Sequence, residues 1–211
     1  MPGTYVRFPL DDLLAVTARE SRRAGAVVVG EDLGNVAEGL REAMARRGLL
    51  GYRVTWFERE WNGDFRAPEN YTPEAIATLT THDLPTLRGF MGFRDIDWRE
   101  RIGRHDPGMI AAERASRDHD LWRLTGMAGV DLAASEHDER EELSLALHGR
   151  LAGGPAAVVA AGDEPARRRS AELPAGDGDM TGWRLPVADI AGVGRFSRLA
   201  DRMTSARRAR A

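Results

Sequence analysis

Short apolar runs recur along the first half of the chain at a nearly constant interval. They begin near residues 26, 52 and 75, about 25 residues apart, and read Ala-Val-Val-Val, Tyr-Arg-Val-Thr-Trp-Phe and Ala-Ile-Ala-Thr-Leu. Runs that are this short and rich in β-branched residues predict buried parallel strands. A strand, a loop and a helix repeated at such an interval are typical of the βα units of a parallel sheet or barrel. The chain is therefore predicted to have an α/β fold.

Helical patterning fills the intervals between the first runs. Apolar residues at helical spacing predict a helix over residues 10–23, started by Pro9, and a second helix over 36–47, capped by Asn35. The run at 26–30 between them is predicted to be a fully buried strand.

The second half of the chain is predicted to be mostly helical before one last strand. Residues 95–151 form a helical insertion in this interpretation, and an apolar stripe of Leu143, Leu147 and Leu151 marks its end. The last strand is predicted at 156–161. The histidines at 105, 119, 137 and 148 fall in the insertion and are expected at the surface.

Four strands with their helices make half of an eight-stranded barrel, whereas a complete barrel needs about 250 residues. We therefore interpret residues 1–200 as the carboxyl-terminal half of a TIM (β/α)8 barrel, with the helical insertion placed before the last strand. A half barrel leaves open parallel edges and an exposed apolar face, so an amino-terminal half is expected to be missing. Residues 201–211, which are rich in arginine, are predicted to be a frayed basic tail.

Composition narrows the class of protein. Of the 211 residues, 42% are hydrophobic and 30% charged, which is usual for a protein that buries a core. The net charge of −3 gives no reason to expect nucleic acid as a partner, and no apolar run is long enough to span a membrane. Without cysteine there is no disulfide framework and no thiolate metal site, which fits a cytoplasmic location.

Two acidic side chains follow the predicted strands. Glu31 comes directly after the first run, and Asp83 follows the third run within Thr-Thr-His-Asp-Leu-Pro-Thr. Acidic groups at the carboxyl ends of parallel strands are how a barrel enzyme gathers its catalytic carboxylates. For Glu31 the alternative is a helix-start carboxylate that pairs with the helix dipole. His82 and Asp83 could be a structural pair, but Pro85 favours a rigid loop that holds them as hydrogen-bonding groups. His82 has no second histidine at ligand spacing, so no metal site is predicted.

Aromatic residues provide further candidates. Trp56 and Phe57 end the second strand and should point to opposite sides, so that one faces the mouth of the barrel. Core packing is an equally good interpretation for Trp56. Trp183 lies in a late loop rich in glycine and proline, where it either holds the loop down or forms a platform for a substrate.

Three motifs together resemble the 4-α-glucanotransferases (amylomaltases, or disproportionating enzymes). These motifs are Gly-Glu-Asp-Leu-Gly at 30–34, Gly-Tyr-Arg-Val at 51–54 with Trp-Phe-Glu at 56–58, and Thr-His-Asp-Leu-Pro-Thr at 81–86. The segment at 5–9 also resembles the sequence that precedes the first motif in that family. The resemblance is dense over residues 3–93, thin over 94–170, and weak at Leu173-Pro174 and Trp183-Arg184-Leu185-Pro186.

The resemblance implies a retaining enzyme that moves α-1,4-glucan segments between glucan chains in maltodextrin metabolism, with no cofactor and no metal. Glu31 would be the general acid/base and Asp83 the carboxylate that stabilises the transition state. His82, Phe57, Asp32 and Trp183 would contact the glucan. Retention requires a second carboxylate about 5 Å away as nucleophile.

The chain departs from the family at the nucleophile. The family places this aspartate in an Arg-Ile-Asp-His type motif before the Glu31 strand, and the sequence contains no such motif. The Asn-x-Pro-Gly motif near the family's end also appears here as Glu172-Leu173-Pro174-Ala175. We expect the chain to be a truncated or split glucanotransferase that is inactive or nearly so without its amino-terminal half. A non-catalytic glucan-binding remnant and an α-glucan hydrolase are the alternatives.

Overall fold

The computed structural model describes residues 6, 8–81, 84–130, 136–160 and 193–210, with the side chains of 136–140, 193–200 and 210 outside that description. Within these residues the fold is α/β, with a parallel sheet in the order β1-β2-β3. Strand β1 spans Gly51–Val54, β2 spans Ala75–Thr78 and β3 spans Val158–Val159. The predicted fold class and parallel pairing are confirmed, although each strand is shorter than expected.

The run at 26–30 forms an edge of this sheet rather than a full strand. Its one parallel bridge joins Val29 to Leu50. The Leu50 amide donates to the Val28 carbonyl at 3.0 Å, and the Gly30 amide donates to the Leu50 carbonyl at 2.8 Å. The prediction of full burial is wrong, because Val27 is 69% exposed and Val29 is 40% exposed. One side of this edge therefore has no cover among the residues that the structure describes.

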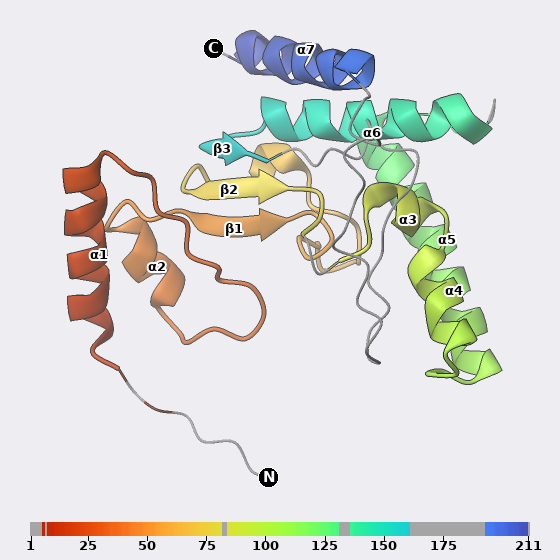
Figure 1. Ribbon diagram of the computed structural model, residues 1–211, viewed down its shortest axis with the longest axis horizontal. Helices are drawn as coiled ribbons and strands as arrows, with labels where there is room; N and C mark the ends of the chain where they lie inside the picture. Colours follow the sequence, from red (N-terminus) through yellow and green to blue (C-terminus); the bar gives the residue numbers. More distant parts are fainter. Residues whose placement is uncertain (1–5, 7, 82–83, 131–135, 161–192, 211) are drawn as a thin grey trace.

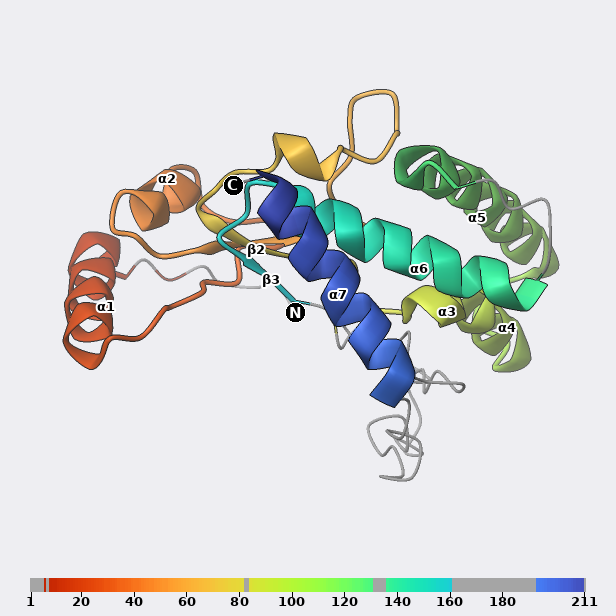
Figure 2. The ribbon, with the colours of Figure 1, turned by 90° about the horizontal axis from the view of Figure 1, so that it is seen from above.

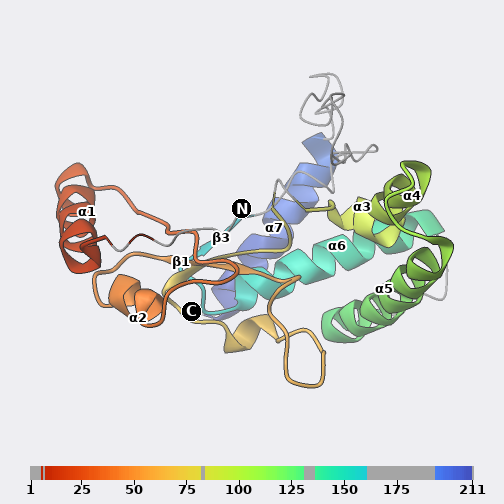
Figure 3. The ribbon, with the colours of Figure 1, turned by 90° about the horizontal axis from the view of Figure 1, so that it is seen from below.

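The helices gather at the two ends of the sheet and along one side of it. Helices α1 and α2 lie at one end, while α3, α4 and α5 lie at the opposite end, beyond the arrowheads of β1 and β2 (Figures 1 and 3). The bounds are α1 Leu10–Ala24, α2 Leu40–Ala45, α3 Leu87–Met91, α4 Arg94–Arg101, α5 Pro107–Ala128, α6 Glu136–Gly153 and α7 Val193–Arg210, with a 3-10 turn at Pro68–Asn70.

Helix α1 confirms its prediction, but α2 is much shorter than predicted. It starts at Leu40, directly after Gly39, which adopts a left-handed conformation with a φ of 78° that glycine tolerates. Gly39 is the N-cap residue of this helix, so the predicted capping by Asn35 is wrong. The turn between the edge strand and α2 is therefore long, and it carries the Glu31 motif.

Helices α4, α5 and α6 occupy much of residues 95–151, so the predicted helical character of this stretch is observed. Asp106 caps α5 by accepting the Met109 amide at 3.0 Å, and Gly129 ends the helix in the left-handed conformation. The Leu143, Leu147 and Leu151 stripe of α6 is buried in the main core. His148, which was expected at the surface, is 1% exposed on the same helix and contacts the Ser144 carbonyl.

The carboxyl-terminal segment also differs from its prediction. Residues 201–210 belong to α7, which crosses α6 in the view from above (Figure 2). The Arg207 guanidinium donates to the carbonyls of Ala156 and Ala157 at 2.9 and 3.2 Å, beside β3. The arginines that suggested a frayed tail therefore include one that anchors a packed helix.

An aromatic stack links the end of β1 to the helical insertion. The Trp56 and Phe90 rings stack at 4.4 Å with an interplanar angle of 13°. The Arg117 guanidinium lies 3.7 Å from the centre of the Phe90 ring and donates to both carboxylate oxygens of Asp95. Core packing of Trp56 is thus confirmed.

The packing of α5 gives a first prediction. Leu124 is fully buried and Trp122, on the same helix, is 70% exposed. Leu124→Ala should lower the free energy of unfolding by about 2–5 kcal/mol, because it leaves a cavity in the core. Trp122→Ala is the matched control and should change it by less than about 0.5 kcal/mol. Urea unfolding followed by circular dichroism measures both, and equal losses would contradict the packing described for α5.

Candidate functional site

Glu31 is an exposed carboxylate at the end of the edge strand. Residues 27, 29 and 31 are every second residue of the segment, and alternation along an extended chain places them on one side. Val27 and Val29 are exposed on that side. The next helix starts only at Leu40, so the alternative of a helix-start carboxylate is not supported. Glu31 is therefore free to meet a ligand or another part of the protein on the uncovered side of the sheet edge.

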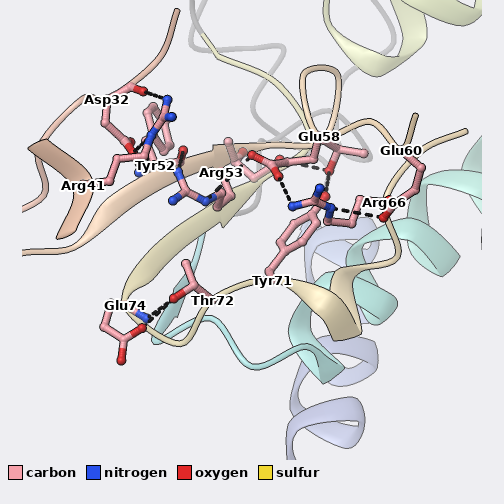
Figure 4. Close-up of polar contacts among 12 residues, drawn as sticks. Asp32, Arg41, Tyr52, Arg53, Glu58, Glu60, Arg66, Tyr71, Thr72 and Glu74 are labelled. Carbon is pink, nitrogen blue, oxygen red and sulfur yellow. Dashed lines mark hydrogen bonds and ion pairs between the residues drawn. The ribbon is translucent and has the colours of Figure 1, made fainter. Parts of the chain in front are cut away.

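The neighbouring Asp32 has the opposite environment. Its side chain has no exposed surface and accepts hydrogen bonds from three donors on two elements (Figure 4). The Tyr52 amide donates to Oδ1 at 2.6 Å, whereas Arg41 Nε and Arg53 Nη1 donate to Oδ2 at 2.8 and 3.0 Å. The Arg41 guanidinium also reaches the Asp32 carbonyl at 2.6 Å. A direct substrate contact by Asp32 is not supported by this geometry.

The electrostatics of this turn follow from these contacts. Burial alone would raise the pKa of the Asp32 carboxyl, but the hydrogen bonds from the Tyr52 amide, Arg53 and Arg41 outweigh it and hold that pKa below its ordinary value. The pKa of the Tyr52 phenol is raised by burial and by the nearby negative charge of Glu31. Asp32 is thus a fixed anion at neutral pH, and Glu31 lies close enough to Tyr52 for its charge to act there.

A row of alternating charges continues from Asp32 along β1 (Figure 4). Arg53 lies 3.8 Å from Glu58, and Arg66 lies 3.6 Å from Glu58 and 3.1 Å from Glu60. The row joins the Glu31 turn to the segment that follows β1. Beside it, burial raises the pKa of the Tyr71 phenol to about 12.

Phe57 belongs to that segment and is 53% exposed, whereas Trp56 is buried. The two rings thus differ in burial, although they lie in the turn after β1, where the Phe57 amide donates to the Val54 carbonyl at 2.9 Å, and not in the strand itself. Of the candidate aromatic residues Trp56, Phe57 and Trp183, the structure describes the first two, and of these Phe57 is exposed. Its position after the carboxyl end of β1 is suited to a ligand contact.

His82, Asp83 and Trp183 lie outside the described residues. Before and after these two positions, the Thr80 hydroxyl donates to the Pro85 carbonyl at 2.8 Å. Thr86 then caps α3 by accepting the Gly89 amide at 3.0 Å.

Arg41, Arg53 and Glu58 are the members of this site that sequence reasoning missed. Their partners lie 9, 21 and 5 residues away in the chain, and no local spacing marks such pairs. Within the described residues no group of three or more His, Asp or Glu could hold a metal ion, and no helix is long and apolar enough to cross a membrane.

A parallel sheet whose edge strand ends in an exposed acid is typical of an α/β enzyme domain. The chain belongs to the 4-alpha-glucanotransferase family, whose sequence model matches residues 1–188. A 4-alpha-glucanotransferase of Mycobacterium tuberculosis is 34% identical over 192 residues, and one of Haemophilus influenzae is 32% identical over 149 residues. These matches cover 88% and 71% of this chain but only 26% and 21% of the relatives, so the chain spans about a quarter of their length.

Solved structures agree with this assignment. The amylomaltase of Corynebacterium glutamicum is 31% identical, with a TM-score of 0.78, and the match covers 97% of this chain and 32% of that one. An amylomaltase of Streptococcus agalactiae in complex with acarbose, 18% identical with a TM-score of 0.58, shares the fold. The resemblance seen in the sequence motifs is therefore confirmed.

The buried Asp32 gives a prediction about acid stability. Its pKa is lower in the folded chain than in the unfolded chain, so its stabilisation is present above the ordinary value of 3.8 and is lost as the pH falls through the folded-state value. Asp32→Asn should lower the free energy of unfolding by about 3 kcal/mol at pH 7, since it removes the charge that pairs with two arginines. The difference from wild type should shrink below pH 3.8.

Urea unfolding between pH 7 and pH 2 measures this difference. Asp11→Asn is the control, because its ion pair with Arg47 lies at the surface and its side chain is 82% exposed. That change should cost less than about 1 kcal/mol at pH 7. A deficit for Asp32→Asn that stays the same at every pH would contradict the role of the Asp32 charge.

Proposed function

We propose that this chain carries the general acid/base of a retaining α-1,4-glucan transfer, performed together with an amino-terminal part of a barrel. The observation that carries the proposal is Glu31, an exposed carboxylate in the family's Gly-Glu-Asp-Leu-Gly turn at the end of the edge strand. Glu31 protonates the leaving glycosidic oxygen and then, as a base, activates the incoming sugar hydroxyl. Such a role requires a carboxyl group that reaches the substrate, which fits its exposure.

Other residues of the chain complete the substrate side of the site in this proposal. Asp83 stabilises the transition state by hydrogen bonds to sugar hydroxyls, with His82 beside it, and Phe57 stacks on a glucose ring. Trp183 is a further contact. The reaction needs neither a metal nor a cofactor, and the substrate is an α-1,4-glucan or maltooligosaccharide in the cytoplasm.

The nucleophile comes from outside this chain in this proposal. The sequence has no Arg-Ile-Asp-His type motif, and the chain spans about a quarter of its relatives. The sheet supports the same view, since the edge segment pairs with β1 through the Val29–Leu50 bridge, and the exposed side chains of Val27 and Val29 leave one face of the segment uncovered among the described residues. We propose that residues 1–200 form the carboxyl-terminal half of the barrel, with 95–151 as the helical insertion and its amino-terminal half as partner.

A chimera tests the function directly. This chain replaces the matching 32% of the Corynebacterium glutamicum amylomaltase, and glucose release from maltotriose is measured. The chimera should release glucose, and Glu31→Gln should reduce kcat by about 10²–10⁴-fold, as expected for loss of an acid/base group. Glu20→Gln on the surface of α1 is the control and should leave the rate unchanged. Full activity of the Glu31→Gln chimera would refute the assignment.

Assays on the chain by itself distinguish glucan transfer from glucan binding. It should release no glucose from maltotriose, because the nucleophile is supplied from elsewhere, and robust release would contradict this. Calorimetry with maltoheptaose should detect binding that Phe57→Ala weakens. Binding by the chain without turnover by the chimera would favour the non-catalytic glucan-binding remnant. Transfer and hydrolysis are distinguished by whether longer maltooligosaccharides accompany the glucose.

A further inference from the structure

The hydrogen-bond ladder between the edge strand and β1 ends in an unusual way. It runs from the Leu50 amide to the Val28 carbonyl, and from the Gly30 amide to the Leu50 carbonyl. In a parallel ladder the next bond would join the Tyr52 amide to the carbonyl of Gly30. The Tyr52 amide instead donates to Asp32 Oδ1 at 2.6 Å. A side-chain carboxylate therefore occupies the place that the continuing strand would fill.

We propose that Asp32 is a positioning residue, whose buried carboxylate ends the edge strand and holds the adjacent Glu31 exposed on the uncovered side of the sheet. This inference rests on the acid/base role proposed for Glu31, because it states how that side chain is kept in place. Asp32 itself does not touch the substrate, since its side chain has no exposed surface.

Asp32, Arg41, Arg53 and the Tyr52 amide form one set of contacts, which we call the clamp. It joins the edge strand to both α2 and β1. Arg41 on α2 binds both the Asp32 carboxylate, at 2.8 Å, and its carbonyl, at 2.6 Å. Arg53 on β1 binds the same carboxylate oxygen at 3.0 Å and the Tyr52 carbonyl at 2.8 Å. The backbone and the side chain of Asp32 are thus both fixed, which leaves the turn little freedom to move Glu31.

The sheet has room for this carboxylate only because residue 51 is glycine. A Cβ built on Gly51 would lie 3.2 Å from Asp32 Oδ2 and 3.3 Å from Oδ1, closer than ordinary van der Waals contact. Gly51 does not need a left-handed conformation, because its φ is not positive. Its small size is the feature that the clamp uses.

The clamp also connects Glu31 with Phe57. Arg53 lies between Asp32 and Glu58, at 3.0 and 3.8 Å, and Glu58 follows Phe57 directly. Glu31 and Phe57 are therefore each adjacent in the sequence to a member of one charged row, Asp32 and Glu58, which Figure 4 shows. A shift of the Asp32 carboxylate would be transmitted to both ends of that row.

Amide hydrogen exchange on the chain itself tests the clamp without reference to activity. In Asp32→Ala the Tyr52 amide and the amides of 30–34 should exchange at least about tenfold faster, because the acceptor is gone, while Ala77 in β2 stays protected. Asp32→Asn keeps an oxygen for the Tyr52 amide but loses the charge that pairs with the two arginines, so this amide should exchange more slowly than in Asp32→Ala and faster than in wild type. Arg47→Ala, which removes the ion pair of Arg47, just after α2, with Asp11 of α1, is the control and should change neither the exchange of the Tyr52 amide nor that of 30–34. Unchanged Tyr52 exchange in Asp32→Ala would overturn the clamp.

Gly51→Ala provides a second, independent variant. Its methyl group should displace the Asp32 carboxylate and speed Tyr52 exchange without removing any polar group, so the test remains decisive if Asp32→Ala does not fold. Tyr52 exchange in Gly51→Ala that equals wild type would show that the carboxylate is not held as described.

The chimera then tests positioning. Asp32→Ala should lower kcat by about tenfold to hundredfold, with KM within about threefold, because a displaced acid/base affects the chemical step more than binding. Asp32→Asn should recover most of kcat, measured at a temperature where circular dichroism shows each variant folded. An unchanged kcat in Asp32→Ala would overturn the positioning role. An active Glu31→Gln chimera would instead refute the proposed function, while the exchange result for the clamp would stand.

Discussion

The buried carboxylate of Asp32 connects two parts of the molecule that share little apolar contact. A small cluster of Ala18, Met44 and Leu49 holds α1 and α2 against the edge strand, while the main core lies between the sheet and α3, α5 and α6. Arg41 comes from the side of the small cluster, and Arg53 comes from β1 beside the main core. Because a buried carboxylate needs its partners, this one contact set constrains the edge strand, α2 and β1 together.

The same constraint separates the roles of two adjacent acids. Glu31 and Asp32 are neighbours in the sequence just beyond the Val29 bridge, yet Glu31 is exposed and Asp32 is buried. One side is buried and rich in donors, so Asp32 is held as a structural anion. The other side is uncovered, so Glu31 remains available for chemistry in the proposed glucan transfer. An acid/base group must reach its substrate in a defined orientation. The anchored Asp32 limits the backbone motion of the adjacent Glu31 and so helps to fix that orientation.

The parts of this structure that depend on local pattern could be predicted from the sequence. Helix α1, the helical character of much of 95–151 and the parallel pairing all follow from periodicity. The parts that depend on long-range contacts could not. Burial of the 26–30 segment, for example, required a neighbour on its far side, and periodicity cannot show whether that neighbour is present. Likewise, the arginines near the carboxyl end suggested solvation, whereas Arg207 bonds to carbonyls beside β3 about fifty residues away.

The candidate site shows the same division. The motif identified Glu31 by its neighbours in the sequence, but Arg41 stands in no motif, and the motif that contains Arg53 gave that residue no role. Their role follows only from the Asp32 carboxylate that they share. Asp32 was grouped with the substrate contacts because it follows Glu31 in the motif, and its burial points to a supporting role instead. Residues of one motif can therefore have different roles. The physical criterion that distinguishes them is whether the side chain is buried with all its hydrogen bonds made or exposed. By that criterion an exposed acid beside a fully bonded one is the arrangement expected of a reacting group and its support.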